Sequence, residues 1–378
     1  MILTLQTTSF GWYGGIPSYN RLVCRVLNDF DCGARSRVLI AMDDPEAVEL
    51  QGSSHPNLQI SAFGGQRLAF VKTALSIVVR ERVELILAGH INYVPLCVLL
   101  RHLQPQMRFG VFVYGREVWD RIPLLRRWAL QQADFVISIS SYTKEQAVRI
   151  NGLRSERVFL LPNALEWTTN RTSSSAHTYS LLQGTKLLSV GRLDSTEQQK
   201  GFDTVIESLS YVAAKIPSVQ YIIIGTGTDL ERHKQLAATA GVSDRVQFLG
   251  SVDEELLRHY YSSCDVFVMP SAQEGFRFVY IEAMEYGKPI VAAKSGGAPE
   301  VVQDGVTGIL VEYGDKEQLA QALIDLCLDS DKCQRLGQAG YQRLQENFTF
   351  PHFKQKLTEI LLRELPPNTI SKFTNTDA

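Results

Sequence analysis

Short apolar segments alternate with longer amphipathic segments along nearly the whole chain. The first half contains seven apolar runs typical of buried strands, with helical periodicity from about Ile16 and over 67–80. The second half repeats the rhythm with six further runs, and helices are predicted over 202–214 and after Thr228. Because strands and helices that alternate at this spacing build parallel sheets, we predict an α/β protein with two doubly wound, Rossmann-like domains.

The boundary between the two domains is predicted in a segment that is rich in Ser, Thr and Asn and lacks hydrophobic periodicity. A chain of 378 residues is long enough for two domains, each with its own core. The pattern after Lys316 is helical up to Leu365 and is interrupted near Phe350 and Pro351. The predicted parts are an N-terminal domain, a linker, a C-terminal domain and a final helix with its tail: residues 1–165, 166–185, 186–348 and 349–378.

The overall charge argues against a nucleic-acid partner, because the formal net charge is only −2. Residues 1–170 carry 18 Lys and Arg against 14 Asp and Glu, whereas residues 171–378 carry 20 against 26. The basic surplus of the first half suits an anionic membrane surface or an anionic acceptor. An ordinary scatter of solvated charges explains it more simply.

The sequence predicts a cytoplasmic protein. The N-terminus lacks the basic region of a signal peptide and is typical of a first strand. The longest uncharged stretch, residues 85–100, is interrupted by Gly89, His90 and Pro95 and is too short to span a bilayer. The six cysteines lie far apart without metal-ligand spacing, so we expect reduced thiols. Membrane contact would therefore be peripheral, through the N-terminal domain at the inner membrane face.

Two glycine-containing motifs follow predicted strands, at the edge of the sheet where doubly wound proteins bind ligands. In GWYGGIPSY, Gly14 and Gly15 precede a helix whose free N–H groups suit a phosphate, although a plain strand-to-helix turn fits as well. In GRLDSTEQQKG, Arg192 and Lys200 are placed to neutralise a diphosphate, or else are solvated loop cations.

A third motif contains two glutamates, in the string EGFRFVYIEAMEYGKP. Glu274 lies in a loop after a predicted strand, and a helix predicted over 278–286 carries Glu282. The next two residues of that helix are apolar and suit the core, so Glu282 is expected on the open face, where a carboxylate can bind two ribose hydroxyls. Two glutamates at this spacing are common by chance, so the spacing alone proves no site.

Together these motifs resemble the signature of the family 4 retaining glycosyltransferases. Seven residues separate Glu274 from Glu282 in a frame similar to the family's EGFG, LEAMA and GKPV strings, and GGAPE (296–300) resembles its Gly-Gly-x-x-Glu loop. Arg192 and Lys200 match the Arg and Lys with which the family grips the donor diphosphate. The resemblance covers nearly the whole chain. It implies a GT-B fold, with an N-terminal acceptor domain and a C-terminal donor domain facing a central cleft, and a C-terminal helix that crosses back to the N-terminal domain.

The resemblance also implies a role for each motif. Glu282 would hold the ribose, and Glu274 would contact the donor sugar. Transfer would retain anomeric configuration by a front-face mechanism in which the leaving diphosphate accepts the acceptor's proton, so neither a metal ion nor a cofactor is expected beside the nucleotide-diphosphosugar co-substrate. The implied catalytic residues are Arg192, Lys200, Glu274 and Tyr114. The implied donor-binding residues are Gly14, Gly15, Arg192, Lys200, Glu274, Gly275, Phe276, Arg277, Phe278 and Glu282.

Two D-x-D strings raise the question of a metal site. They are Asp29 with Asp31 and Asp329 with Asp331, and both adjoin predicted helix ends rather than strand ends. We interpret them as solvated helix caps, not as metal ligands.

Two positions depart from the family pattern. Where the family has His-Gly-x-Glu, this chain reads YGREVW, with Tyr114 in the place of the histidine. A tyrosine hydroxyl can donate a hydrogen bond but does not relay protons near neutrality as imidazole does. Arg277 replaces the second glycine of the EGFG string, where it would either add a phosphate or substrate contact or crowd the donor sugar.

The acceptor side has weaker signals. His90 and Asn92 follow a predicted strand, and Arg116 lies in the YGREVW string, so all three are acceptor candidates. A structural histidine and an Asn cap are the alternatives. The string RIPLLRRWAL predicts a helix around Leu124–Ala129 that either packs on the core with an exposed basic face or rests on an anionic membrane.

We expect transfer of a hexose from a UDP- or GDP-sugar to a saccharide or lipid-linked acceptor. Two alternatives remain open. One is a UDP-sugar 2-epimerase, which shares the GT-B architecture. The other is a catalytically weak nucleotide-sugar-binding protein, an alternative that Tyr114 and Arg277 favour.

Overall fold

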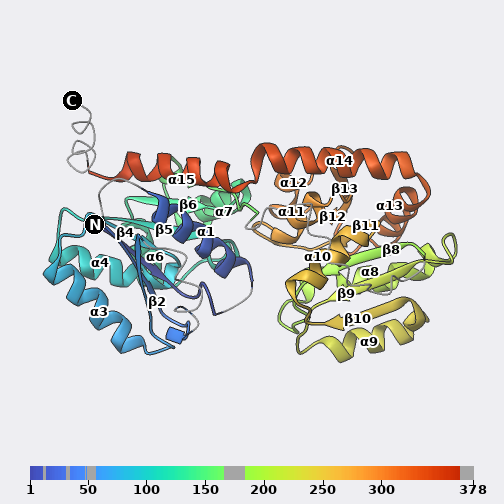
Figure 1. Cartoon of the computed structure of the whole chain (residues 1–378), viewed down its shortest axis with the longest axis horizontal. Helices are drawn as coiled ribbons and strands as arrows, with labels where there is room; N and C mark the ends of the chain where they lie inside the picture. The colour runs from blue at the N-terminus through green and yellow to red at the C-terminus, as the bar shows by residue number, and fades with distance from the viewer. Residues whose placement is uncertain (12–13, 31–34, 47, 49–56, 166–183, 367–378) are drawn as a thin grey trace. The chain divides into compact units, whose positions relative to one another are not determined.

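The computed structural model shows two compact units (Figure 1). Unit 1 comprises Met1–Glu166 and Thr349–Ala378, and unit 2 comprises Trp167–Phe348. Most of the predicted linker, 166–183, lies outside the residues that the structure describes. The described residues are 1–11, 14–30, 35–46, 48, 57–165 and 184–366.

Unit 1 is built on a parallel sheet of seven strands in the order β3-β2-β1-β4-β5-β6-β7. The strand order reverses between β1 and β4, as in doubly wound folds. All seven apolar runs predicted in the first half form strands. They are β1 (Ile2–Gln6), β2 (Ser36–Ile40), β3 (Leu58–Ala62), β4 (Leu85–Ala88), β5 (Arg108–Val113), β6 (Phe135–Ser138) and β7 (Val158–Leu160).

Helices connect these strands, as the alternating pattern predicts. The helix predicted over 67–80 is α3 (Arg67–Arg80). Local signals fix helix ends: Ser140 caps α7 by accepting a hydrogen bond from the Thr143 amide, and Gly152 ends it in a left-handed conformation. The other described helices of four or more residues in unit 1 are α1 (Gly15–Asp29), α4 (Val94–Leu103), α5 (Arg116–Trp119), α6 (Leu124–Gln131), α7 (Ser141–Asn151) and α15 (Phe350–Glu364).

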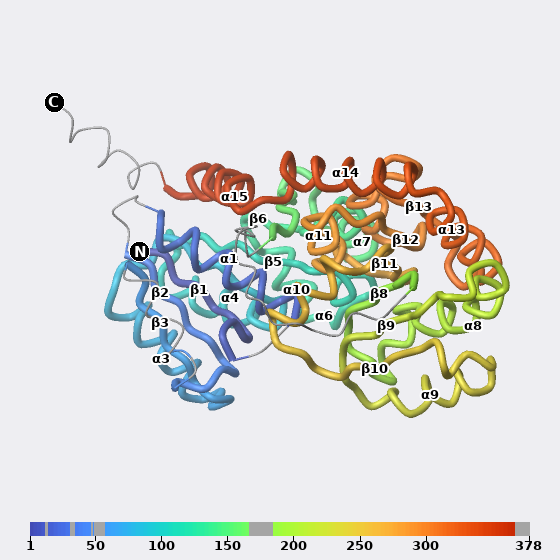
Figure 2. The backbone as a smooth tube through the Cα atoms, turned by 45° about the vertical axis from the view of Figure 1, so that its right-hand side comes forward, coloured from blue at the N-terminus to red at the C-terminus, as the bar shows by residue number. Residues whose placement is uncertain are grey.

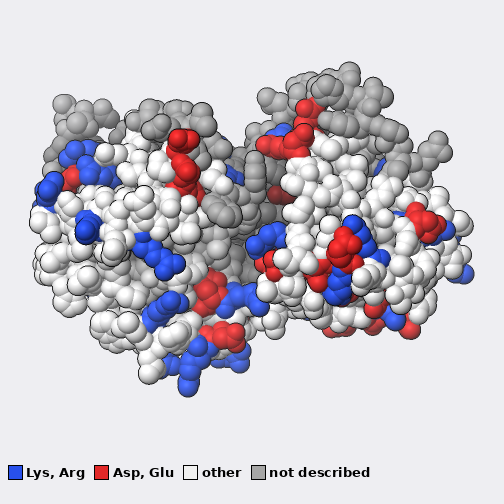
Figure 3. Space-filling view, turned by 90° about the horizontal axis from the view of Figure 1, so that it is seen from below, with Lys and Arg blue, Asp and Glu red and all other residues white. Residues whose placement is uncertain are grey.

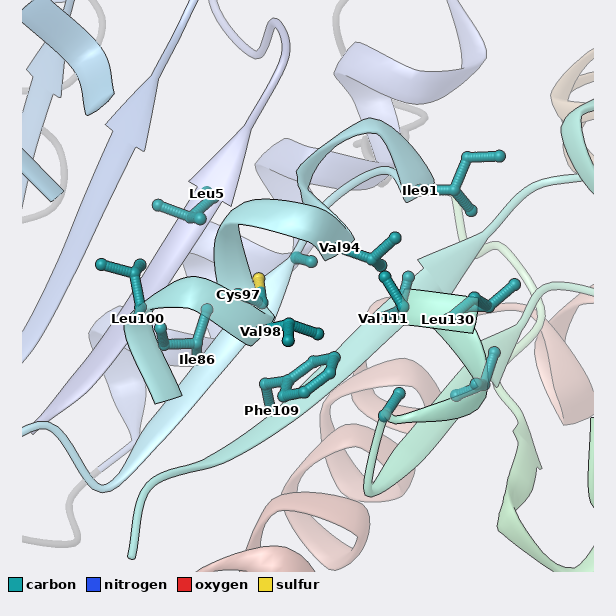
Figure 4. Close-up of a cluster of buried hydrophobic side chains, with 14 of the residues drawn as sticks. Leu5, Ile86, Ile91, Val94, Cys97, Val98, Leu100, Phe109, Val111 and Leu130 are labelled. Carbon is teal, nitrogen blue, oxygen red and sulfur yellow. The ribbon is translucent and has the colours of Figure 1, made fainter. Parts of the chain in front are cut away.

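The core of unit 1 lies between the sheet and its helices. Figure 4 shows strand side chains facing α4, with Leu130 of α6 beside them. The strand side chains labelled there are apolar and almost completely buried, because helices cover the sheet. The side chains labelled there are Leu5, Ile86, Ile91, Val94, Cys97, Val98, Leu100, Phe109, Val111 and Leu130.

Unit 2 repeats the architecture with a parallel sheet of six strands, in the order β10-β9-β8-β11-β12-β13. The strands are β8 (Lys186–Val190), β9 (Gln220–Ile224), β10 (Val246–Gly250), β11 (Val266–Met269), β12 (Ile290–Ala293) and β13 (Gly308–Val311). The helices are α8 (Phe202–Ala213), α9 (Leu230–Thr239), α10 (Glu254–Ser263), α11 (Phe278–Glu285), α12 (Ala298–Val301), α13 (Lys316–Leu328) and α14 (Ser330–Asn347).

The final helix, α15, returns to unit 1 and packs beside α1, as Figures 1 and 2 both show. Lys354 forms an ion pair with Asp29 at 2.8 Å, and the ring of Phe353 meets that of Tyr19 edge-on at 5.2 Å. The helix begins at Phe350 with a proline in its first turn, so the predicted interruption falls just before this residue. The crossing helix implied by the family resemblance is therefore present.

The D-x-D strings lie at helix ends, as predicted. Asp329 caps α14 by accepting a hydrogen bond from the Lys332 amide, and Asp29 is the last residue of α1. Asp31 lies outside the described residues. Across the described parts of the chain, no group of three or more His, Cys, Asp or Glu side chains has the arrangement of a metal site.

Candidate active site

Three loops of unit 2 meet at the carboxyl ends of the neighbouring strands β8, β11 and β12. The amide of Ala272 donates to the carbonyl of Gln199 at 2.9 Å, which joins the loop after β11 to the loop after β8. The amide of Gly297 donates to the carbonyl of Glu274 at 2.7 Å, which joins the loop after β12 to the loop after β11. The Arg192, Glu274 and GGAPE motifs, which are far apart in sequence, thus form one cluster.

The glycines of these motifs allow the loops to pack backbone against backbone. A Cβ atom on Gly297 would lie 2.0 Å from the carbonyl oxygen of Gly275. A Cβ atom on Gly201, which has a φ of 82°, would lie 2.3 Å from the carbonyl oxygen of Pro270. A side chain at either position would separate the loops, so the glycines determine the shape of the cluster.

The two cations predicted to hold a diphosphate converge on one carboxylate. Arg192 pairs with Oε1 of Glu197, and Nζ of Lys200 lies 2.5 Å from Oε2 of the same side chain. The Arg192 side chain is 72% exposed, whereas that of Lys200 is 10% exposed and also donates to the Arg192 carbonyl at 3.0 Å. Burial lowers the pKa of Lys200, an effect that its hydrogen bond to Glu197 opposes.

Glu274 is held by the unusual residue Arg277. Nη2 of Arg277 donates to Oε1 of Glu274 at 2.6 Å and to the hydroxyl of Ser271, and Nη1 contacts Sδ of Met269 at 3.0 Å. Gln273, just before the glutamate, has a φ of 52°, the only positive φ among the described residues other than glycine. The loop therefore carries local backbone strain next to the carboxylate.

Glu282 lies on α11, as predicted, and its Oε2 accepts a hydrogen bond from the Tyr261 hydroxyl at 2.6 Å. Burial, and next the nearby Glu282 carboxylate, raise the pKa of Tyr261, so this hydroxyl stays protonated and remains a donor. Ala283 and Met284 are buried, as the sequence predicts. Gly275 and Phe276 are buried at the start of the same segment, and Phe278 begins the helix half-buried.

In unit 1, the glycine motif follows a loop that a buried aspartate organises. Oδ2 of Asp43 accepts hydrogen bonds from the amides of Ser9, Phe10 and Gly11 at 2.8, 2.6 and 3.2 Å. Gly14 and Gly15 are exposed at the start of α1, and Gly14 has a φ of 141° that favours glycine. The structure therefore places this motif at a helix N-terminus, as expected.

Tyr114 is packed into unit 1 rather than free to react. Its hydroxyl donates to Oδ1 of Asn20 at 3.2 Å, its amide donates to Glu117, and its ring meets Tyr19 edge-on at 5.4 Å. Burial, followed by the negative charge of Glu117, raises the pKa of Tyr114 well above its ordinary value. The side chain is thus a hydrogen-bond donor and not a base near neutrality.

His90 is fixed by its own turn. Its Nδ1 accepts a hydrogen bond from the Asn92 amide at 3.2 Å, so the neutral imidazole carries its proton on Nε2. Burial lowers the pKa of His90, and the neighbouring Glu117 opposes this shift. Two further acceptor candidates are exposed: Asn92, two residues after His90, and Arg116, two residues after Tyr114.

Charge alone marks no large site on the face that Figure 3 shows. Lys and Arg side chains lie there in separate small groups on unit 1, with wide uncharged areas between them. No described helix is long and apolar enough to cross a membrane. The five described cysteines are free thiols, in agreement with the prediction for them, and Cys32 lies outside the described residues.

Comparison with known proteins decides the family. The model of the glycosyl transferases group 1 matches residues 180–343. A protein of Mycolicibacterium smegmatis named GDP-mannose-dependent alpha-(1-6)-phosphatidylinositol monomannoside mannosyltransferase is 30% identical over 270 residues, which cover 67% of this chain and 70% of that protein. The chain belongs to the glycosyl transferases group 1. It is a glycosyltransferase, and the protein of the same name from Mycobacterium tuberculosis is 29% identical to it over 264 residues, 66% of this chain and 68% of that protein.

Solved structures of other proteins share the fold of this glycosyltransferase. HepE of Anabaena, solved in complex with UDP, has a TM-score of 0.76 and 22% identity, and the match covers 96% of this chain and 99% of that one. Sucrose-phosphate synthase of Thermosynechococcus elongatus also has a TM-score of 0.76 and 22% identity, over 96% of this chain and 98% of that one. The GT-B fold predicted from the motifs is thereby confirmed.

Several residues that organise the candidate site segments of the two units were not among the predicted site residues. Glu197 lies between Arg192 and Lys200 in the same motif, so the sequence could have indicated that its carboxylate pairs with these cations. Tyr261 and Asp43 have no such signal, because their contacts join segments that only the folded sheets bring together.

Proposed function

We propose that this glycosyltransferase moves a hexose from a UDP- or GDP-sugar to a saccharide or lipid-linked acceptor, with retention of anomeric configuration. The observation that carries the proposal is the loop cluster of unit 2, in which the cations Arg192 and Lys200 lie on the loop that is hydrogen-bonded to the loop of Glu274. The relatives are named GDP-mannose-dependent, and HepE was solved with UDP, which supports a nucleotide-diphosphate donor of either base.

The chemistry follows from the charge that the donor develops. As the bond to the sugar breaks, negative charge grows on the leaving diphosphate, where Arg192 and Lys200 would stabilise it. In a front-face mechanism a diphosphate oxygen accepts the acceptor's proton, so no protein base is required. This suits Tyr114, whose hydroxyl is committed to Asn20 and whose raised pKa makes it a poor base. Glu282 would hold the ribose, and the Tyr261 hydroxyl, which donates a hydrogen bond to its Oε2, would orient it.

The experiment is a turnover assay with GDP-mannose and UDP-glucose, scored both by hydrolysis and by transfer to added acceptors. Arg192→Ala is expected to lower turnover by about a hundredfold or more, because it removes a group that stabilises the leaving charge. Lys234→Ala is the control, since Lys234 is an exposed cation of unit 2 whose ammonium pairs with Glu231. Unchanged turnover in Arg192→Ala would remove the diphosphate assignment, and nucleotide-sugar binding without any turnover would support the weakly catalytic alternative.

A lipid-linked acceptor is supported by the surface of α6. Leu124, Leu125 and Trp128 are 74%, 64% and 49% exposed on this short helix, and Arg121 and Arg126 are exposed beside them. Apolar side chains with flanking cations are typical of helices that lie on anionic membranes. The helix also contacts the turn that follows His90, so a lipid bound there would present its head group near an acceptor candidate. We propose that α6 gives unit 1 a peripheral membrane contact.

This contact is tested by sedimentation with vesicles of phosphatidylglycerol and phosphatidylcholine, compared with phosphatidylcholine alone. The protein is expected to bind the anionic vesicles, and Leu124→Glu with Leu125→Glu is expected to abolish the binding. Leu328→Glu is the control, because Leu328 is 66% exposed in unit 2. Equal sedimentation of the double variant and the wild type would contradict the proposed contact.

A further inference from the structure

Arg277 is an ionised side chain in an unusually enclosed place. Its side chain is 7% exposed, and its Nε is buried without a hydrogen-bond partner in the described structure. Its backbone has ordinary extended angles at the residue that caps α11, so the arginine fits this position without backbone strain. Burying a guanidinium is unfavourable unless a carboxylate compensates the charge. In this protein that carboxylate is Glu274, at 2.6 Å.

The arginine also connects two of the loops. Its Nη2 donates to the Ser271 hydroxyl, and that hydroxyl donates to the Lys200 carbonyl at 3.0 Å. Burial lowers the pKa of Lys200, and Arg277 lowers it further whereas Glu274 raises it, so these three charges lie close together. A chain of hydrogen bonds therefore runs from the Glu274 carboxylate through Arg277 and Ser271 to the loop of the two diphosphate cations.

We propose that Arg277 is a positioning residue for the donor sugar: it holds Oε1 of Glu274 so that Oε2 is directed to the transferred sugar. This inference rests on the proposed function, in which Glu274 contacts that sugar. The contacts argue against the two roles considered from the sequence, since both Nη groups are engaged within the protein and the Nε is buried. Arg277 would therefore act on the donor through Glu274, and it would leave binding of the nucleotide part to other residues.

The experiment compares ligands with and without the sugar. Arg277→Met keeps an unbranched buried side chain but removes the charge, and Arg277→Lys keeps the charge but loses the forked contact. Dissociation constants are measured for UDP, GDP and their glucose and mannose esters, together with kcat and KM for the accepted donor. Glu274→Gln and the double variant Glu274→Gln with Arg277→Met complete a mutant cycle.

We expect Arg277→Met to leave the affinity for the nucleoside diphosphate within about twofold and to lower kcat/KM by about tenfold or more, the size of a lost hydrogen bond to a charged group. Arg277→Lys should recover part of that loss. The double variant should be little worse than Glu274→Gln alone, because the two side chains act as one unit.

Three outcomes would overturn the proposal. These are an equal loss of affinity for the diphosphate and the nucleotide sugar, additive losses in the cycle, or wild-type kinetics in Arg277→Met. If Arg277→Met does not fold, Arg277→Lys and Glu274→Gln decide the question. For each variant, the affinity for the nucleotide sugar is then compared with the affinity for the nucleoside diphosphate. If the wild type binds no nucleotide or nucleotide sugar, the proposed function is overturned as well. If the wild type turns over the donor and Arg277→Met does so equally fast, only the positioning role is overturned.

Discussion

The candidate donor-binding residues of unit 2 and two candidate site residues of unit 1, Tyr114 and His90, are held in different ways. In unit 2, Arg192, Lys200 and Glu274 all take part in ion pairs, on loops that hydrogen bonds join. In unit 1, Tyr114 is held by a neutral hydrogen bond and aromatic packing, and His90 by a backbone amide. The three residues of unit 2 are thus held by opposite charges, whereas the Tyr114 hydroxyl and the His90 ring contact neutral groups.

This difference suits what each unit would recognise under the proposed function. The diphosphate is the same in every UDP- and GDP-sugar, so charged groups at fixed positions suit it. Acceptor substrates vary from one glycosyltransferase to another. Neutral hydrogen-bonding side chains on loops can be exchanged without loss of the fold, so they suit such variation. Substitutions that disturb the loops of unit 2 should therefore cost more activity than those that remove one polar group in unit 1.

After Arg192→Ala, the largest effect is expected from Gly297→Ala. The new Cβ would lie 2.0 Å from the Gly275 carbonyl oxygen, so the loop of Glu274 must move, at a cost of about 1–3 kcal/mol in the free energy of unfolding. We expect nucleotide-sugar affinity to fall by at least about tenfold, the equivalent of about 1.4 kcal/mol. Calorimetric titration measures the affinity. Gly241→Ala is the control for destabilisation away from the cluster, because its φ of 68° strains an alanine but no atom lies near its Cβ position.

A smaller effect is expected from Tyr114→Phe in unit 1. The change removes the hydroxyl that donates to Asn20 and keeps the packing against Tyr19. One neutral hydrogen bond contributes about 0.5–1.5 kcal/mol, so kcat should fall by less than about tenfold. Steady-state kinetics tests this expectation. A loss as large as that of Arg192→Ala would show that Tyr114 takes part in the chemistry, and the contrast between the units would fail.

Glu197→Gln is expected to act in the opposite direction. Its carboxylate lies between Arg192 and Lys200, where the diphosphate would have to bind. Removing a competing, partly exposed ion pair should tighten nucleoside-diphosphate binding by about twofold to fivefold. Titration with UDP and GDP measures the change, with Glu231→Gln as the control on the exposed face of the same unit. Weaker binding by Glu197→Gln would mean that Glu197 positions the cations instead of competing for them.

The smallest effect is a pH dependence that His90 contributes to stability. Because burial lowers its pKa in the folded state, the unfolded chain binds the proton first as the pH falls through about 6.5. The contribution to stability is therefore complete above this pH and is lost below it. We expect the fall in Tm between pH 7.5 and pH 5.5 to be smaller in His90→Gln than in the wild type. An unchanged fall would contradict the assignment, and His102→Gln, at an exposed histidine, is the control.

Much of the fold could be predicted from the sequence because the strands of parallel sheets are continuous apolar runs. The order of β1 to β13 along the chain follows from those runs alone. The donor motifs were found for a related reason, since each follows a strand directly. Arg192, Lys200 and Glu274 therefore had to lie at the same edge of one sheet.

The pairing of side chains could not be predicted in the same way. Which residue holds Glu274 depends on the turn at Gln273, whose positive φ has no sequence signal. The Tyr261 contact to Glu282 depends on how α10 packs beside α11, and the contact of Asp43 with the loop after β1 depends on the pairing of β1 with β2. Such contacts are tertiary, so local periodicity does not encode them.

The proposed function depends most on Arg192 and Lys200, which would bind the diphosphate of the donor. The most direct measurement compares the affinity for UDP with that for uridine, and for GDP with that for guanosine, in the wild type and in Lys200→Ala. We expect the wild type to bind the preferred diphosphate at least about a hundredfold more tightly than its nucleoside, and Lys200→Ala to lose most of this preference while its affinity for the nucleoside stays the same. A preference that is equally large in Lys200→Ala would show that Lys200 does not bind the diphosphate.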